Sequence, residues 1–420
     1  MTVKNKPPRQ CNFCNKTQLQ VKKLISGENV YICNECVKLC NEILSTENLF
    51  DAQEDSAKIT PAKIKAYLDE RVIGQDLAKI SLSVAIYNHL QRVDHPVIDD
   101  VEIEKSNLLI AGPSGCGKTY MLSMISKLLN IPFVIVDATS LTESGYVGLD
   151  VEDCITRLYQ VADNDIEKTQ RGIVYIDEID KKSRKNENNS ITRDVSGEGV
   201  QQALLKMIEG YQVKVQPEGG RKNPRGEFIT IDTKNILFIL GGAFSGIEDV
   251  ITRRLEENGS GIGFNAKIRS EEVNIEVRKH LLQQAISDDF KNFGIIPELI
   301  GRLPIFVPFD SLTEEQLVQI LHVPKNALVK QFQKTFSLDH INLEFRDDAL
   351  KEIAKKAFAN KTGARGLRGT IEKILLSTQF ELPDLCSKGV SSVIVTENCV
   401  TDGLDPVKIY RGEIEIPNEQ

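Results

Sequence analysis

Between about residues 60 and 310, short apolar runs alternate with longer amphipathic segments along the chain. Short continuous apolar runs are typical of strands buried on both faces, and the amphipathic segments between them are typical of helices that cover a sheet. The pattern therefore predicts an α/β domain with a parallel sheet flanked by helices. The predicted strands cover residues 107–111, 132–137, 172–177, 235–240 and 303–308.

The pattern changes at both ends of this region. Before it, residues 44–59 are polar and acidic without a sustained apolar period, and we interpret them as a tether. A helix is expected to begin at Thr60 and Pro61, because proline is favoured at the first helical position. After Asp310, three helical patterns and a β-like stretch at 392–396 predict a smaller, mostly helical domain; the helical patterns cover 313–321, 347–359 and 366–380.

Composition and charge narrow the class of protein. The 420 residues are too many for one compact core, and 41% hydrophobic with 27% charged residues is ordinary for a globular chain. The net charge of −8 argues against broad binding to nucleic acid or to an anionic membrane. No apolar run approaches a membrane span, and the N-terminus resembles neither a signal nor a transit peptide, so we expect a cytoplasmic protein.

Five of the nine cysteines lie in the first forty residues. Cys11 and Cys14 form one CxxC pair, and Cys33 and Cys36 form a second pair after eighteen intervening residues. This spacing allows four thiolates to surround one tetrahedral Zn²⁺. Unligated thiols or a redox dithiol are the alternatives, but two pairs outside a βαβ context favour zinc. Because four protein ligands leave no open position for a substrate, we predict a structural site in a recognition domain.

A glycine-rich loop follows the first predicted strand and precedes a helical pattern at 120–129. Strand, glycine loop and helix form the context that a P-loop requires, because the backbone N–H groups of such a loop wrap phosphate groups. Lys118 is expected to reach the β- and γ-phosphate oxygens, Thr119 to bind Mg²⁺, and Cys116 to act as a small buried filler. The predicted ATP-binding residues of the loop are Gly112, Pro113, Ser114, Gly115, Cys116, Gly117, Lys118 and Thr119.

Two adjacent carboxylates end a second buried strand. Asp177 and Glu178 follow the apolar run 173–176, fifty-nine residues after Lys118. We predict that Asp177 is the magnesium partner and that Glu178 is the general base that polarises a water molecule for attack on the γ-phosphate. This acidic pair favours an ATPase that performs mechanical work over a GTPase switch or a small-molecule kinase.

The cysteine pairs, the P-loop, the acidic pair and the sequence SGYVG at 144–148 together resemble the ClpX family of AAA+ unfoldases, and the resemblance covers nearly the whole chain. It implies an AAA+ P-loop ATPase that works as a homo-hexamer and delivers tagged proteins, with the help of adaptor proteins, to the ClpP peptidase. The implied domains are a zinc-binding domain at 1–50, a linker at 51–62, a large ATPase domain at 63–310 and a small lid domain at 311–420. The implied cofactors are ATP, Mg²⁺ and Zn²⁺.

The resemblance also assigns further residues of the nucleotide site. Arg302, in the sequence GRLP, matches the arginine finger that acts on the nucleotide of a neighbouring subunit. Arg365 matches the sensor arginine of the small domain, which contacts the nucleotide of its own subunit. Val72 and Ile73 match the segment that packs on adenine. No residue is assigned to sense the γ-phosphate at the end of the strand at 235–240, which continues into two glycines.

Three loops carry the implied contacts with proteins. Tyr146 and Val147 match the pore loop that grips substrate polypeptide. Arg221 and Lys222 match a second substrate loop, although Asn223 stands where the family usually has histidine, so the preference for tags is expected to differ. The docking loop for ClpP matches Ile262, Gly263 and Phe264.

Two other functions compete with this one. A remodelling chaperone would keep the motor but would not need a peptidase, and deletion of residues 262–264 would separate the two activities. A nucleic-acid motor would use the zinc domain to grip a strand, but the acidic chain and the pore loop disfavour it. No histidine lies in a nucleophile motif, so peptide cleavage is expected to belong to a partner.

Overall fold

The computed structural model describes residues 9–27, 30–40, 59–95, 97–98, 101–142, 149–183, 197–215, 228–257 and 281–411. The chain divides into two compact units, Met1–Ile59 and Thr60–Gln420. None of the helices in the described part of the chain combines the length and the apolar character that a membrane crossing needs.

The first unit is a small fold around the four cysteines. Its strands β1 (Leu24–Ser26) and β2 (Tyr31–Cys33) pair in antiparallel register, and a helical segment at 34–40 follows directly. The buried residues of this unit are three cysteines, and only a few partly buried apolar side chains pack against them: Val21, Leu24 and Ile32. So small an apolar core supplies little of the free energy of folding, and the thiol cluster must supply the rest.

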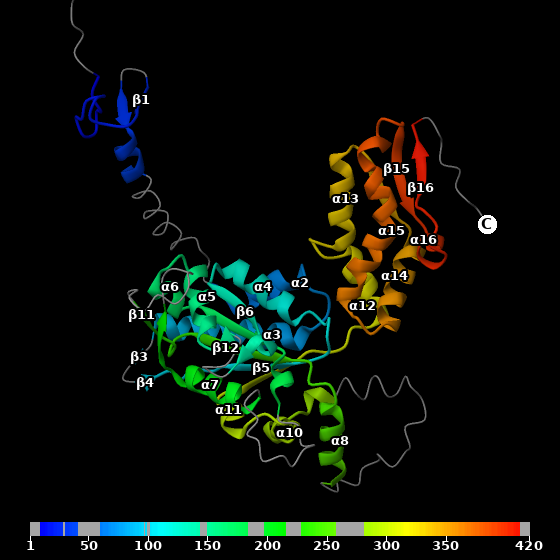
Figure 1. Cartoon of the computed structure of the whole chain (residues 1–420), viewed down its shortest axis with the longest axis horizontal. Helices are drawn as coiled ribbons and strands as arrows, with labels where there is room; N and C mark the ends of the chain where they lie inside the picture. The colour runs from blue at the N-terminus through cyan, green and yellow to red at the C-terminus, as the bar shows by residue number, and fades with distance from the viewer. Residues whose placement is uncertain are drawn as a thin grey trace, which may run out of the picture. The chain divides into compact units, whose positions relative to one another are not determined.

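The second unit contains a five-stranded parallel sheet in the order β13-β5-β12-β9-β6, of which Figure 1 labels β5, β6 and β12. All five predicted strands are confirmed, and they place the P-loop and the acidic pair at the carboxyl end of the sheet. The strands are β5 (Leu108–Ala111), β6 (Phe133–Asp137), β9 (Ile173–Asp177), β12 (Leu237–Gly242) and β13 (Ile305–Pro308).

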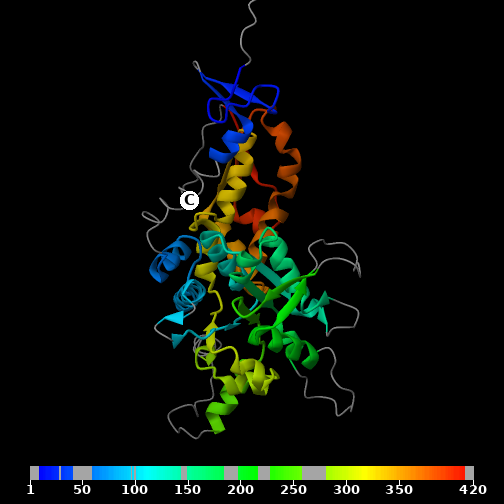
Figure 2. The same cartoon turned by 90° about the vertical axis from the view of Figure 1, so that its left-hand side faces the viewer.

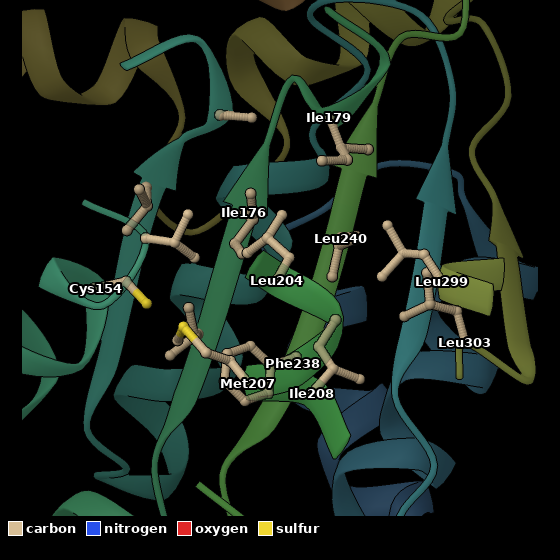
Figure 3. Packing of buried hydrophobic residues seen from close by; sticks show 14 of the residues in the cluster. Cys154, Ile176, Ile179, Leu204, Met207, Ile208, Phe238, Leu240, Leu299 and Leu303 are labelled. Carbon is tan, nitrogen blue, oxygen red and sulfur yellow. The ribbon is translucent and has the colours of Figure 1, made fainter. Parts of the chain in front are cut away.

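Both faces of this sheet are covered, as the continuous apolar runs predict. On one face Phe238 and Leu240 of β12 pack beside Leu204 and Met207 of α7 (Glu198–Glu209), as Figure 3 shows. On the other face the apolar side chains of the sheet pack against α2 (Pro61–Asp69), α3 (Asp76–Asp94) and α4 (Lys118–Leu129). Helix α2 begins at Pro61 with Thr60 as its cap, so the predicted start is confirmed and residues 61 and 62 of the predicted linker belong to the helix.

Smaller elements surround the sheet. Two antiparallel strand pairs, β3 with β4 and β10 with β11, and one parallel pair, β7 with β8, were not predicted because each strand is short and only partly apolar. These elements are β3 (Val97–Ile98), β4 (Val101–Glu102), β7 (Leu141–Thr142), β8 (Leu149–Asp150), β10 (Gln212–Val215), β11 (Ile229–Asp232), α5 (Asp153–Val161), α6 (Ile166–Gln170), α8 (Ile247–Glu257), α10 (Ser287–Phe293) and α11 (Pro297–Gly301).

The part of the chain after Asp310 forms a separate core of helices and a small sheet, drawn in yellow to red in Figures 1 and 2. The three predicted helices and the β-like stretch are confirmed, whereas α13 and the strands β14 and β16 were not predicted. The predicted stretch lies in β15, the centre of a sheet in the order β14-β15-β16. The elements are α12 (Glu314–His322), α13 (Leu328–Leu338), β14 (Asn342–Phe345), α14 (Asp347–Ala359), α15 (Ala364–Leu385), β15 (Val390–Val395), α16 (Glu397–Thr401) and β16 (Val407–Tyr410).

Candidate functional site

The loop between β5 and α4 takes its shape from its glycines. Gly115 and Gly117 have φ angles of 76° and 102°, in the left-handed region that favours glycine. Gly112 lies so close to the chain just after the neighbouring strand β13 that a Cβ on it would be 2.5 Å from the carbonyl oxygen of Phe309. The loop is therefore folded tightly over the carboxyl end of β5, as a P-loop requires.

Lys118 extends back over this loop. Its Nζ donates hydrogen bonds to the carbonyl oxygens of Gly112 at 2.7 Å and Pro113 at 3.0 Å, and the residue is 8% exposed. Among the described residues, no carboxylate lies within ion-pair distance of this ammonium group. A buried cation at a helix N-terminus, beside free loop amides, attracts an anion such as a phosphate.

Thr119 and Asp177 meet beside the loop. The Thr119 hydroxyl donates a 2.9 Å hydrogen bond to Asp177 Oδ2, and the backbone N–H of Glu178 donates a 2.9 Å hydrogen bond to Asp177 Oδ1. Glu178 adopts a left-handed backbone conformation with φ 58°, which is unusual for a non-glycine residue and is found at functional sites. The sheet thus brings Thr119 next to Asp177 and Glu178, which follow it by about sixty positions in the sequence.

These oxygen atoms suit magnesium. A hydroxyl and a carboxylate are hard ligands of the kind that Mg²⁺ prefers, and Mg²⁺ keeps several waters and binds substrate phosphates besides a few protein ligands. Thr119 and Asp177 are the residues that would hold it. Asp177 is only partly buried and lines the cavity, so the arrangement fits a metal that enters together with a nucleotide.

The loop and the acidic pair line a cavity of about 490 Å³, within the range of nucleotide and cofactor sites. Val72 and Ile73 line it, as the sequence predicts, and Arg365 lines it from the small domain. Part of its wall was not predicted, because the residues come from α12, α13 and the chain around them, which carry no motif; these are Leu312, Ile320, Pro324, Asn326, Ala327, Leu328 and Gln331. Apolar side chains such as Val72 and Leu328 line the cavity together with the P-loop and the carboxylates, so its lining offers contacts for a base as well as for phosphates.

The small domain touches the P-loop directly. The backbone N–H of Ala364, the first residue of α15, donates a 3.1 Å hydrogen bond to the carbonyl oxygen of Gly115. Arg365 reaches the Ser114 hydroxyl at 3.4 Å. Two glycines face each other here, since a Cβ on Gly363 would be 2.9 Å from the same Gly115 oxygen. A displacement of the loop is therefore transmitted to α15.

Gln75 is a functional candidate to which the sequence assigned no role. Its side chain donates to the carbonyl oxygen of Asp310 at 2.8 Å and accepts from the backbone N–H of Asp310 at 2.9 Å. The same Nε2 lies 3.5 Å from the carbonyl oxygen of Cys116. Gln75 is 7% exposed with φ 61°, so a strained backbone holds one amide between the P-loop and the start of the small domain. The adjacent Val72 and Ile73 were the signal that could have identified it.

Cys116 is a buried part of the loop. It is 3% exposed, and burial raises the pKa of its thiol although the nearby Lys118 charge opposes this shift. A thiol in this state is a poor nucleophile, in agreement with its predicted role as a filler.

Arg302 does not line the cavity of its own chain. It follows α11, and its guanidinium forms an ion pair with Glu209 at 2.8 Å while remaining 58% exposed. Its carbonyl oxygen accepts a 3.2 Å hydrogen bond from the side chain of Asn107, which directly precedes β5. Arg302 is therefore at the amino end of the strand whose carboxyl end carries the P-loop.

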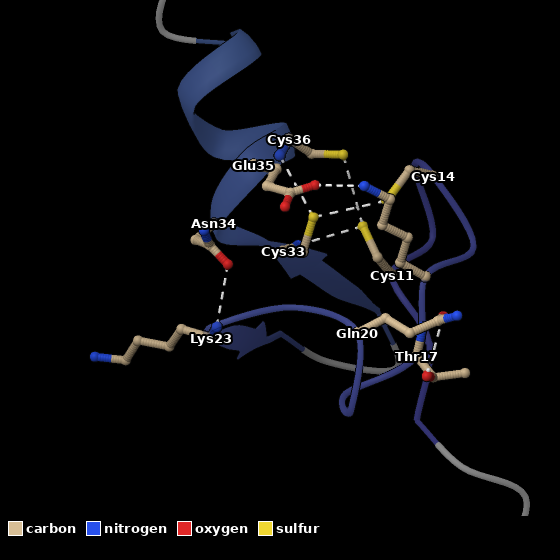
Figure 4. Close-up of polar contacts among 10 residues, drawn as sticks. Cys11, Cys14, Thr17, Gln20, Lys23, Cys33, Asn34, Glu35 and Cys36 are labelled. Atoms are coloured by element: carbon tan, nitrogen blue, oxygen red, sulfur yellow. Dashed lines mark hydrogen bonds and ion pairs between the residues drawn. The ribbon is translucent and has the colours of Figure 1, made fainter.

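The four predicted cysteine ligands of the N-terminal unit converge (Figure 4). The Sγ atoms of Cys11 and Cys36 are 3.8 Å apart, those of Cys14 and Cys33 are 3.6 Å apart, and all four lie within 4.8 Å of one another. Tetrahedral coordination with Zn–S bonds of about 2.3 Å places sulfur atoms about 3.8 Å apart, so the cluster fits zinc. Backbone N–H groups of Cys33 and Cys36 point at sulfur atoms, as expected around thiolates.

The remaining predicted residues lie outside the described part of the chain. These are the pore residues Tyr146 and Val147, the second substrate loop with Arg221 and Lys222, and the docking residues Ile262, Gly263 and Phe264. Their roles stay predictions.

Comparison with protein families agrees with this geometry in three places. Residues 9–46 match the ClpX C4-type zinc finger, and residues 103–306 match the AAA domain of the Cdc48 subfamily. Residues 312–383 match the C-terminal, D2-small domain of ClpB protein. The zinc-finger match covers the thiol cluster, and the AAA match covers the sheet with its P-loop and acidic pair. The D2-small match covers the small domain, which supplies part of the cavity wall. An AAA domain of this kind implies ATP hydrolysis. The chain accordingly belongs to the ClpX type of AAA+ ATPases.

Proposed function

We propose that this ATPase is a protein unfoldase and translocase that recognises tagged proteins, unfolds them and delivers them to a ClpP-type peptidase. It works in the cytoplasm as a homo-hexamer, and its zinc domain receives substrates or adaptor proteins. The zinc finger on the same chain as the AAA domain supports this specialisation, because it matches a family that is described as ClpX-type, whereas the AAA match is more general.

The observation that carries the proposal is the contact between the small domain and the P-loop. At the start of α15, Ala364 contacts Gly115 and Arg365 contacts Ser114. The binding or release of a phosphate in the loop therefore changes the contacts that hold the small domain against the P-loop. A domain that moves with each hydrolysis step can perform mechanical work on a polypeptide.

Within the cavity the residues have separate tasks. Lys118 leaves its loop carbonyls to neutralise the β- and γ-phosphates, and Arg365 contacts the same nucleotide from the small domain. Thr119 and Asp177 hold magnesium, which when bound offsets the negative charge of the phosphate oxygens. Glu178 accepts a proton from the attacking water, and its backbone N–H to Asp177 keeps the two carboxylates in fixed relation.

Arg302 acts on a neighbouring subunit. Strand β5 has 4 residues, so its two ends are separated by roughly 13 Å at ~3.3 Å per residue. Arg302 is at the end away from its own P-loop and remains more than half exposed. An arginine in this position is suited to a nucleotide bound by another copy, which makes hydrolysis depend on assembly.

Three protein contacts are proposed from the resemblance. Tyr146 and Val147 grip the polypeptide in the central pore, and Arg221 with Lys222 attracts acidic groups or terminal carboxylates of tags. Ile262, Gly263 and Phe264 insert into the peptidase.

The test uses a tagged fluorescent protein, ATP and a ClpP-type peptidase, and it compares the intact chain with Glu178→Gln. The intact chain should abolish the fluorescence and cause degradation. Glu178→Gln should bind ATP and assemble but leave the reporter fluorescent, since amide and carboxylate have the same shape and only the carboxylate accepts the proton. Equal loss of fluorescence with both proteins would rule out Glu178 as the base. A chain that hydrolyses ATP but never unfolds the reporter would refute the unfoldase function.

A further inference from the structure

Tyr175 carries a hydroxyl group that is buried but makes no hydrogen bond with the described residues. The residue is 0% exposed in the centre of β9, and none of the residues that the structure describes forms a hydrogen bond with its hydroxyl. A buried polar group without a partner loses its hydration and gains nothing in return, so such groups are rare in folded proteins. Phenylalanine would fill the same space without this cost. The hydroxyl therefore calls for an explanation.

The direction of the Tyr175 side chain explains why the hydroxyl is present. Tyr175 lies opposite Ile239 in the β9–β12 register, but its hydroxyl extends further toward the carboxyl end of the sheet. A Cβ on Gly241, two residues beyond Ile239, would be 2.3 Å from this hydroxyl. Gly241 thus leaves the space into which the hydroxyl projects, on the side where the P-loop and the acidic pair lie.

Asp177 and Thr119 are the polar neighbours at this end. Tyr175 and Asp177 are two residues apart on one strand, so their side chains lie on the same face of the sheet. Burial and the nearby Asp177 carboxylate both raise the pKa of Tyr175, and the Thr119 hydroxyl is also close. A phenol hydroxyl has one proton that it can donate in a hydrogen bond.

The Asp177 carboxylate still has room to accept. Its Oδ2 accepts from Thr119 and its Oδ1 accepts from the backbone of Glu178, one hydrogen bond each. A carboxylate oxygen can accept two hydrogen bonds, so each oxygen keeps one free position. A small rotation of the carboxylate is enough to redistribute these bonds.

We propose that Tyr175 is a positioning residue of the ATP site, whose hydroxyl donates a hydrogen bond to the Asp177 carboxylate once nucleotide and magnesium are bound. The bond fixes the orientation in which Asp177, together with Thr119, supports the metal. Gly241 is part of the same arrangement, because any side chain there would displace the hydroxyl. This inference rests on the proposed roles of Thr119 and Asp177.

The test is Tyr175→Phe in the full-length chain, with Thr378→Val as its matched control. Thr378 lies on the buried side of α15 in the small domain, and its hydroxyl likewise has no partner among the described residues. Both substitutions remove an unsatisfied hydroxyl and keep the volume nearly constant. In the absence of nucleotide and magnesium, both variants should melt at the same temperature as the unchanged chain or on the order of 2 °C above it.

The two variants should differ in their response to magnesium. The affinity for a fluorescent ATP analogue is measured in EDTA and over a series of Mg²⁺ concentrations. Tyr175→Phe should leave the affinity in EDTA unchanged and raise the Mg²⁺ concentration for half-maximal tightening by about tenfold, the effect of one hydrogen bond to a charged group. Thr378→Val should change neither quantity.

Two outcomes would overturn the inference. If Tyr175→Phe shows the magnesium dependence of the unchanged chain, the hydroxyl is only tolerated in the core. If the variant melts at a clearly lower temperature and loses affinity in EDTA as well, Tyr175 is structural. Asp177→Asn tests the underlying assignment separately: an unchanged magnesium dependence in that variant would refute the metal site itself, whatever Tyr175 does.

Discussion

The contact between Gly363 and the P-loop offers a direct test of how the small domain is coupled to ATP. Gly363 has φ 56° and ψ −148°, a region of the backbone map that is almost restricted to glycine. In Gly363→Ala the new Cβ would be 2.9 Å from the carbonyl oxygen of Gly115, 0.5 Å inside the 3.4 Å at which ordinary contacts begin. That oxygen is the one that accepts the hydrogen bond of Ala364.

The size of the effect follows from these two conflicts. A residue forced into this backbone region costs about 1–3 kcal/mol. Alanine can relieve the strain and the overlap only by rotating its backbone and withdrawing the start of α15 from the loop. Binding of ATP must then restore the contact, so the cost is subtracted from the binding free energy. The affinity for ATP should fall by roughly 5- to 150-fold, since about 1.4 kcal/mol corresponds to a factor of ten.

The assay is equilibrium binding of a fluorescent ATP analogue to the full-length chain, with thermal melting measured in parallel. Gly389→Ala is the matched control, because Gly389 also has positive φ, at 85°, but has no atom within 4 Å of an added Cβ and belongs to the turn before β15. It should lower the melting temperature and leave ATP affinity within about twofold, because its strain is the same with and without nucleotide. Equal losses of affinity in both variants, or none in Gly363→Ala, would refute the coupling.

Three further predictions follow from other parts of the chain. Removal of zinc by a chelator, or Cys33→Ser, should unfold the N-terminal unit and make it sensitive to protease while ATP hydrolysis continues, because three cysteines form its buried core; Cys40→Ser, outside the cluster, should leave it folded, and a resistant zinc-free unit would contradict this account. Burial lowers the pKa of His89 to about 4 from an ordinary 6.5, so the unfolded chain binds the proton more tightly and stability should be lost as the pH falls from 6.5 to 4. The loss is about 3 kcal/mol at most, and His89→Gln, which keeps a donor for the Arg171 carbonyl oxygen, should remove this pH dependence in thermal melts; an unchanged slope would show that other groups cause it. Gly369 lies inside α15 with no atom near an added Cβ, so Gly369→Ala should stabilise the small domain by about 0.5–1 kcal/mol in denaturant unfolding, and destabilisation would indicate a contact that the fold does not explain.

Much of the fold was predictable because local signals agree with the tertiary structure. The five sheet strands are continuous apolar runs, and burial on both faces leaves no alternative for such segments in a chain without membrane-spanning helices among its described residues. The missed strands are those whose signal is weak: β10 and β11 alternate over only 4 residues each, and β14 and β16 depend on pairing with β15. Short strands of this kind are stabilised by their partners, which sequence periodicity does not show.

The residues of the candidate site also differ in how far the sequence predicts them. Residues that must be of one chemical type at a fixed spacing were found in advance: the four cysteines, the glycines of the P-loop, Lys118, and the acidic pair at Asp177 and Glu178. Val72, Ile73 and Arg365 were named only through the resemblance to a family, and other residues that line the cavity by their shape were not named. The apolar wall formed by Leu312, Ile320 and Leu328 has no motif, because any large aliphatic residue can pack against a base.

The sequence by itself determined the chemistry of this protein, since metal ligation and phosphate binding depend on specific functional groups at short spacings that the chain cannot vary. Only the tertiary structure decided how these groups are connected. It brought Gly363 against Gly115, placed the amide of Gln75 between the P-loop and Asp310, and left the hydroxyl of Tyr175 buried near Asp177. The physical reason is that such couplings depend on contacts between residues that are far apart along the chain, and their geometry is set by the packing of the sheet and of α15.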